Sequence, residues 1–161
     1  MRKSQVLQKE VAGNTEKYNS YREAWSRIKL AQEHGFYLEA IAIQESIISD
    51  RLISYLHSKQ EATFSVHDKN FPSFNKLIKK WRSKFSSGLS SGNYSNLIDE
   101  VDQWRLSRNQ IIHAIVKSKP SEPTQSIDLF LYQAKEAAKT GEAIAREVCN
   151  WSKNNKRNKK F

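Results

Sequence analysis

Arg108, Asn109 and His113 are the residues whose types and spacing best suit a chemical reaction. The imidazole of histidine titrates near neutral pH and can move a proton, whereas the guanidinium of arginine stays charged and matches phosphate oxygens. Asn109 precedes His113 by four positions, so the two share nearly one face of a helix, while Arg108 lies about 140° around the helix from His113. The three side chains are therefore expected to flank a groove, with Asn109 holding the imidazole or a phosphate oxygen.

RNA is the substrate that these groups suit. Cleavage without a metal requires a base that takes the 2′-hydroxyl proton, attack of that oxygen on the adjacent phosphorus, and a cation that neutralises the developing charge. We assign the proton transfer to His113 and the phosphate contact to Arg108, which predicts 2′,3′-cyclic phosphate and 5′-hydroxyl ends. Protonating the leaving oxygen needs a second acid, and a homodimer with its two-fold axis at this helix would supply one.

The segment Arg108-Asn109-Gln110-Ile111-Ile112-His113 resembles the signature of the HEPN superfamily, an Arg followed by a polar residue, three further residues and His. The segment from Glu39 to Leu52 is similar to an early bundle helix of that family. The resemblance implies an all-α bundle and a metal-independent endoribonuclease that acts as a homodimer, in the role of a toxin, an antiphage defence effector or an RNA-processing enzyme. It also implies a neutralising antitoxin or regulatory protein if the chain is a toxin. Ile115 stands where toxins silenced by a nucleotidyltransferase carry Tyr, so that mode of silencing is not expected.

Two other functions remain open. The first is a non-catalytic HEPN-like module in which Arg108 and His113 bind RNA, a nucleotide or an acidic protein. The second is a basic helical nucleic-acid-binding protein with no relation to that family. Glu45, and more weakly Glu39, are supporting candidates because a carboxylate on the second helix would orient Arg108 or His113, although a solvated glutamate is the simpler interpretation.

The charge balance predicts a polyanionic partner. Lys and Arg number 27 against 17 Asp and Glu, which gives a net charge of +10 and favours RNA. For the lysines and arginine between residues 76 and 84, a solvated helix face is the simpler interpretation, and a frayed, solvated helix end explains the basic C-terminal tail as simply as phosphate binding does. The RNA-binding candidates are Lys79, Lys80, Arg82, Lys84, Lys117, Lys156 and Arg157.

The sequence predicts no metal site and no cofactor. The other histidines, His34, His57 and His67, have no metal-ligand spacing, and there is no glycine-rich loop for a nucleotide triphosphate. Cys149 is the single cysteine, which excludes an intramolecular disulfide and predicts a small buried apolar residue. With no apolar run of membrane-spanning length, we expect a cytoplasmic protein without a membrane partner.

Helices must position these residues. Only five Gly and three Pro occur in 161 residues, which disfavours a β-sandwich or barrel, and apolar residues recur at steps of three and four. We therefore predict an all-α, four- to five-helix up-and-down bundle. Residues 1–152 form one domain, and residues 153–161 form a basic C-terminal tail.

The expected helix boundaries follow from capping residues and prolines. Gly35 ends the first helix, Pro72 or Ser73 starts the third, and Pro120 stops the fourth. A polar connection from Ser58 to Asn70 and a flexible loop from Ser86 to Asn93 separate the middle helices. The predicted helices run from about Ser4 or Thr15 to His34, from Phe36 to His57, from Pro72 or Ser73 to Phe85, from Tyr94 or Asn96 to Lys117, and from Thr124 to Trp151.

Overall fold

The computed structural model describes residues 2–59 and 71–158, with side chains described from residue 15 onward. The described ranges are helical apart from turns and one isolated bridge between Ser91 and Tyr94, which confirms the predicted all-α class. Most of the predicted polar connection between Ser58 and Asn70 lies outside the described residues. The helices are α1 (Arg2–Glu33), α2 (Tyr37–Ser58), α3 (Phe74–Ser83), α4 (Leu97–Ala114) and α5 (Ile127–Arg157).

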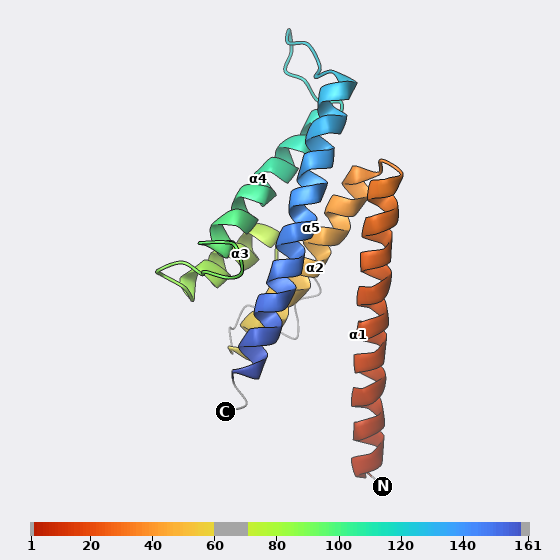
Figure 1. The fold of residues 1–161 in the computed structure, drawn as a ribbon, viewed down its shortest axis with the longest axis vertical. Helices are drawn as coiled ribbons and strands as arrows, with labels where there is room; N and C mark the ends of the chain where they lie inside the picture. Colours follow the sequence, from red (N-terminus) through yellow and green to blue (C-terminus); the bar gives the residue numbers. More distant parts are fainter. Residues whose placement is uncertain (1, 60–70, 159–161) are drawn as a thin grey trace.

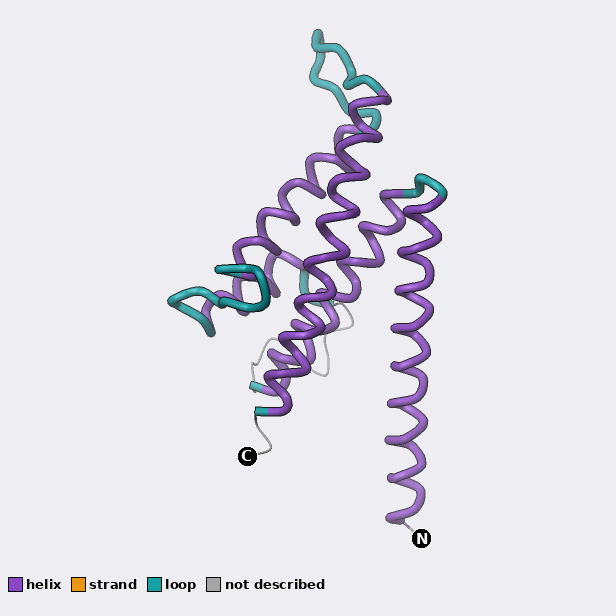
Figure 2. The backbone as a smooth tube through the Cα atoms, in the orientation of Figure 1, coloured by secondary structure: helices purple, strands orange, loops and turns teal. Residues whose placement is uncertain are grey.

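Helix α5 lies at the centre of the bundle. It packs along α2 and α4, α1 lies against α2, and α3 fills the space between α2 and α4 (Figure 1). The backbone tube shows α1 and α2 as antiparallel neighbours joined by a tight turn, with α4 and α1 on opposite sides of α5 (Figure 2). The described helices include none long and apolar enough to span a lipid bilayer.

The turn between α1 and α2 is closed as the glycine predicted. Gly35 has φ +77°, a left-handed conformation that glycine adopts without steric cost. The amide of Phe36 donates to the carbonyl of Ala31 at 2.7 Å, and the amide of Gly35 donates to Gln32 at 3.3 Å. This pair of hydrogen bonds is the Schellman motif, which satisfies the last carbonyls of α1 and reverses the chain into α2.

Small residues on α5 bring three helices close together. Gln44 on α2 donates to the carbonyl of Ala138 at 2.7 Å, and the indole of Trp104 on α4 donates to the carbonyl of Ala137 at 2.8 Å. A Cβ placed on Gly141 would lie 2.7 Å from the Trp104 ring. The small stretch from Ala134 to Gly141 therefore permits a close approach of the three helices and leaves two α5 carbonyls open to the side chains of Gln44 and Trp104.

An aromatic cluster joins α2, α3 and α5 near the C-terminal end of α5. Trp151 packs against Trp81 with ring centroids 5.1 Å apart and edge-on against Tyr55 at 4.9 Å. Phe85, just after α3, completes the cluster at 6.1 Å from Trp151. Trp81 is fully buried, so the short α3 is held mainly by this packing rather than by its own helix propensity.

The segment from Ser86 to Asn93 is an ordered turn, which corrects the expectation of a flexible loop. Ser91 and Tyr94 exchange backbone hydrogen bonds at 3.0 Å, and the amide of Leu97 donates to the carbonyl of Leu89 at 2.7 Å. Leu89 and Tyr94 also pack against the core. Composition alone predicted flexibility because it does not register these few apolar contacts.

Several apolar residues expected in the core are exposed. Tyr18 and Leu30 on α1, and Ile127 and Leu131 on α5, all lie on the surface, as does Phe71 before α3. The inward positions are occupied by Ile28 and Ala31 on α1 and by Phe130 and Ala134 on α5. Periodicity predicted that the helices are amphipathic but placed the buried stripe too broadly.

Candidate functional site

Arg108 lies on α4 where this helix faces α2 and α3. Its guanidinium forms an ion pair with Glu45 of α2, and it lies over the ring of Phe74 of α3 with the central carbon 5.9 Å from the ring centroid. The side chain is 16% exposed, and its buried Nε has no hydrogen-bond partner. Arg108 is thus a largely buried cation compensated by one carboxylate.

Glu45 is therefore placed against Arg108 rather than in solvent. Burial raises the pKa of the Glu45 carboxyl, and the charge and hydrogen bond of Arg108 oppose this rise without cancelling it. The pair occupies part of the arginine fork that would otherwise bind a phosphate. A phosphate reaching Arg108 would have to share the guanidinium with Glu45 or displace it.

Asn109 and His113 lie on a different face of α4 from Arg108. His113 is exposed in the last turn of the helix, and Lys117 Nζ lies 3.3 Å from its Nδ1. Because an ammonium group can only donate, Nδ1 is the acceptor in this contact. One chain therefore presents His113 outward with a lysine beside it, while Arg108 points into the bundle.

An exposed stripe on α4 carries Asn109 and His113. Leu106, Asn109, His113 and Val116 follow one another at steps of three, four and three, a spacing that keeps them on one side of the helix and its extension. Leu106 is 44% exposed and Val116 is 76% exposed, and the neighbouring Ile112 is also exposed. We call Leu106, Asn109, His113 and Val116 the α4 outer stripe; three of them are exposed and Asn109 is half-buried.

Glu39 does not join the site. It is exposed in the first turn of α2, beside Phe36. The ion pair at Arg108 is formed by Glu45, one and a half helical turns further along α2. The structure therefore brings together one of the two glutamates and Arg108.

The predicted RNA-binding residues do not form one surface. Arg82 on α3 pairs with Asp99 and Asp102 of α4, and Asp102 also binds Arg105 at 2.8 Å, so the charge of Arg82 is compensated within the fold. Lys117 lies beside His113. Lys79, Lys80 and Lys84 belong to α3 and its end, whereas Lys156 and Arg157 are exposed in the last turn of α5, which extends into the predicted tail.

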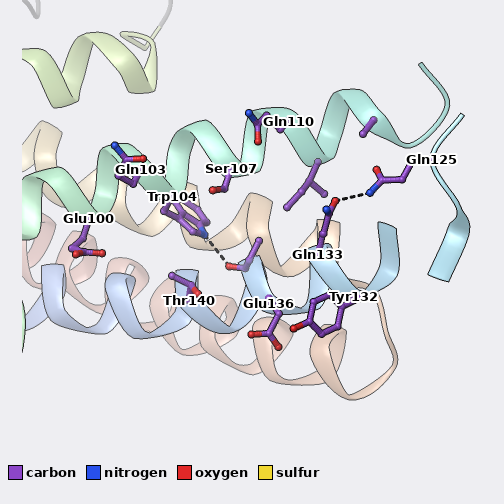
Figure 3. Close-up of a pocket in the computed structure, with 13 residues that line it drawn as sticks. Glu100, Gln103, Trp104, Ser107, Gln110, Gln125, Tyr132, Gln133, Glu136 and Thr140 are labelled. Carbon is purple, nitrogen blue, oxygen red and sulfur yellow. Dashed lines mark hydrogen bonds between the residues drawn. The ribbon is translucent and has the colours of Figure 1, made fainter. Parts of the chain in front are cut away.

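A cavity of about 580 Å³ lies between α4 and α5 on the face of α4 away from His113. Amide and hydroxyl groups line it, including Ser107, Gln110 and Thr140, and Gln125 donates to Gln133 at 2.7 Å across its mouth (Figure 3). Arg108, Asn109 and His113 are not part of its lining. Two carboxylates at its edges, Glu100 and Glu136, make it poorly suited to a phosphate.

A second cavity, of about 270 Å³, was not predicted from the sequence. It lies between α1, α2 and α5 and is lined by basic and aromatic side chains, among them Arg22, Tyr21, Arg51 and Lys153. The signal was present in the interleaving of Lys17-Tyr18 and Tyr21-Arg22 at helical spacing. Tyr18 and Tyr21 also recur at the three- and four-residue steps that predict a buried helix face, and this periodicity obscures the basic and aromatic pattern.

No protein-family model, curated protein or solved structure matches this chain. The part of the chain that the structure describes holds no group of three or more His, Cys, Asp or Glu side chains arranged to bind a metal ion.

Proposed function

We propose that the protein is a metal-independent endoribonuclease that works as a homodimer. In this proposal His113 is the general acid or base, Arg108 binds the phosphate, and Asn109 positions the imidazole or the phosphate. The observation that carries this proposal is the α4 outer stripe, which holds Asn109 and His113 among exposed apolar residues. A catalytic histidine on an unpartnered apolar helix face is well suited to a site completed by a second copy. The resemblance to the HEPN signature supports the same assignment.

A dimer would supply the second imidazole that one chain lacks. Within one helix Arg108 and His113 point about 140° apart, so they do not readily converge on one phosphate. Two copies related by a two-fold axis along the α4 outer stripe would place the second His113 nearby, and Arg108 would reach the imidazole of the other chain after its guanidinium leaves Glu45 and turns out of the bundle. One imidazole would then accept the 2′-hydroxyl proton while the other protonates the leaving 5′-oxygen.

The test is incubation of the purified protein with total RNA in excess EDTA, followed by end-group analysis. We expect fragments with 2′,3′-cyclic phosphate and 5′-hydroxyl ends, and a loss of at least a hundredfold in rate for His113→Ala and Arg108→Ala. His34→Ala is the matched control, because His34 is also an exposed histidine at a helix end, directly after α1, a helix that lies on the other side of α5 from α4 (Figure 1). A metal requirement or 5′-phosphate ends would contradict the proposal.

The ion pair between Arg108 and Glu45 favours a second candidate function, a non-catalytic HEPN-like module for RNA, nucleotide or protein binding. In this case Arg108 is a structural cation, and the α4 outer stripe serves only for association. A well-folded dimer that binds RNA but leaves diverse RNAs intact in EDTA would favour the module over the enzyme.

A further inference from the structure

The cavity between α1, α2 and α5 combines positive charge with exposed aromatic rings. Its cations are Lys17, Arg22, Arg51 and Lys153. Asp50 compensates Lys17, whereas no ion pair in the described part of the chain involves the other three. We call this site the α1–α5 cavity; it has a surplus of positive charge inside a concave surface, which concentrates anions.

Aromatic rings accompany these cations. The guanidinium of Arg51 lies over Tyr21 with its central carbon 4.2 Å from the ring centroid, and that of Arg22 lies 5.8 Å from the Tyr18 centroid. Tyr21 is fixed by donating from its hydroxyl to Asp50 at 2.6 Å, while Tyr18 is 64% exposed. Tyr21 therefore holds the guanidinium of Arg51 in a stacked position, and the exposed ring of Tyr18 offers a surface on which a base can stack.

One hydrogen-bond donor of Arg51 has no partner among the residues that the structure describes. Its Nε is buried without a partner, and no carboxylate of the described residues pairs with it. Because Tyr21 covers one face of the guanidinium, the in-plane N–H groups are the donors that a ligand would meet. Phosphate oxygens match that planar set of donors.

The dimensions favour part of a polymer over a free metabolite. At about 270 Å³ the cavity is smaller than the roughly 300–1,000 Å³ pockets that bury a whole small molecule. Lys153 on its wall is followed at a helical step of three by Lys156, which continues the positive surface along the end of α5. A strand bound in the cavity therefore finds further phosphate contacts beyond it.

From these observations we propose that the α1–α5 cavity binds one nucleotide of a single-stranded RNA, with Arg22, Arg51 and Lys153 on phosphates and Tyr18 stacking on a base. The choice of RNA rests on the proposed function. Helices α1 and α4 lie on opposite sides of α5 (Figure 2), and the cavity is lined from α1, α2 and α5, so it binds the substrate strand at a distance from His113 and contributes to affinity rather than to the chemical step.

The experiment measures binding separately from cleavage. A fluorescent 2′-O-methyl oligonucleotide about twelve nucleotides long lacks the attacking hydroxyl, and its anisotropy in EDTA reports its Kd for the full-length protein. We expect the double variant Arg22→Glu/Lys153→Glu to raise Kd at least tenfold and to reduce the slope of log K against log salt by about 1.4, because about 0.7 is lost for each phosphate contact with a single strand. Lys135→Glu/Lys139→Glu, with the same change of charge on exposed lysines of α5, is the control.

Tyr18→Ala tests the stacking platform without changing charge. The ring is exposed, so its removal should leave the fold intact, and we expect Kd to rise about fivefold or more. Cys149, the only cysteine, lines the same cavity and supplies a local readout. Saturating oligonucleotide is expected to slow its reaction with methyl methanethiosulfonate.

The outcomes separate this inference from the proposed function. Equal losses of affinity in the cavity and control variants, or an unchanged Cys149 reaction rate in the complex, overturn the cavity proposal even if the protein cleaves RNA. Oligonucleotide binding that depends on Arg22, Lys153 and Tyr18 in a protein that cleaves nothing supports the cavity and refutes the nuclease. Equally tight binding of poly-glutamate, unaffected by Tyr18→Ala, assigns the cavity to acidic peptides and overturns the RNA proposal.

Discussion

Glu45 is a partly buried carboxylate whose environment makes stability depend on pH. Its pKa is raised because burial outweighs the attraction of Arg108, so the folded state holds the Glu45 proton more tightly than the unfolded chain does. The contribution of this group to stability is therefore fully present below its unfolded pKa and is lost as pH rises through its raised folded pKa. The sign is opposite to that of a carboxylate stabilised by a strong ion pair.

Glu45→Gln should remove this dependence. We predict that the free energy of unfolding of the wild type, minus that of the variant, falls as pH rises from about 4 toward neutrality, because other carboxylates cancel in the difference. Urea unfolding at a series of pH values measures it. Glu39→Gln is the control, since Glu39 is exposed at the start of the same helix. A difference that rises with pH would show that Arg108 dominates over burial.

Arg108 contributes to stability as well as to the proposed chemistry, so its variants need a thermodynamic control. Arg108→Ala leaves Glu45 partly buried and unpaired, and we predict a loss of about 1–2 kcal/mol in the free energy of unfolding. In the double variant Arg108→Ala/Glu45→Ala the loss should be less than the sum of the single losses, with a coupling of about 1 kcal/mol measured by a double-mutant cycle. Additive losses would mean that the ion pair has no energetic role.

At the scale of elements, the contact of α2, α4 and α5 depends on the missing side chain of Gly141. Alanine at this helix-interior position would gain about 1 kcal/mol of helix propensity, but its Cβ would lie 2.7 Å from the Trp104 ring and also meet the Gln44 side chain. Overpacking typically costs about 1–3 kcal/mol, so after the gain in helix propensity we predict that Gly141→Ala lowers the free energy of unfolding by up to about 2 kcal/mol.

Thr140→Ala is the matched control for this prediction. Thr140 is an exposed neighbour on the same helix, and alanine there should change stability by less than about 0.5 kcal/mol. Thermal or urea unfolding compares the two variants. An increase in stability for Gly141→Ala would show that the three helices separate at little cost.

The elements could be predicted from sequence where local chemistry determines them. Gly35 and Ser73 set helix boundaries through a left-handed turn and a side-chain cap, and both effects operate within a few residues. The ion pair between Arg108 and Glu45 links α4 to α2 across many intervening residues, so it depends on helix packing that periodicity does not contain. The sequence predicted both residues as candidates but left their pairing open.

The same limit explains the cavity that the sequence did not reveal. Tyr18, Tyr21 and Trp25 have the spacing of a buried stripe, and a pattern on one helix cannot show where its neighbours end. Arg51 of α2 and Lys153 of α5 line the cavity together with Tyr21 of α1. The groups that make this site basic and aromatic are thus brought together only by the tertiary fold.

At the scale of the whole molecule, positive charge is distributed unequally over the two sides of the bundle. On the α3–α4 side, Arg82 and Arg105 are compensated by Asp99 and Asp102. On the α1–α5 side, Arg22 and Lys153 have no such partners among the described residues. A dimer formed through the α4 outer stripe would therefore direct its two basic cavities away from the interface, where both can contact long RNAs.

The orientation of Arg108 and His113 on α4 makes a further prediction about this dimer. If one active site takes Arg108 from one chain and His113 from the other, a mixed dimer of Arg108→Ala and His113→Ala chains keeps one site with an arginine and one imidazole, and it lacks only the second imidazole as acid. Equal mixing after unfolding and refolding gives roughly half mixed dimers, each with one of two sites, so the recovered activity should be measurable but below about a quarter of the wild-type activity. Each variant alone should stay inactive, and cleavage of a labelled RNA in EDTA measures the recovery.

Leu106→Glu provides the control for this mixing experiment. A carboxylate on the exposed α4 outer stripe should leave the monomer folded but prevent association, because an interface would have to bury the charge. Sedimentation should then show monomers, and adding Leu106→Glu to both variants should abolish the recovery of activity. Recovery without a dimer would contradict the shared site. If a stable mixed dimer forms and stays inactive, either cleavage requires both imidazoles or Arg108 and His113 act from the same chain, and in the second case the helix has to rearrange or Glu45 has to release Arg108 before RNA is cut.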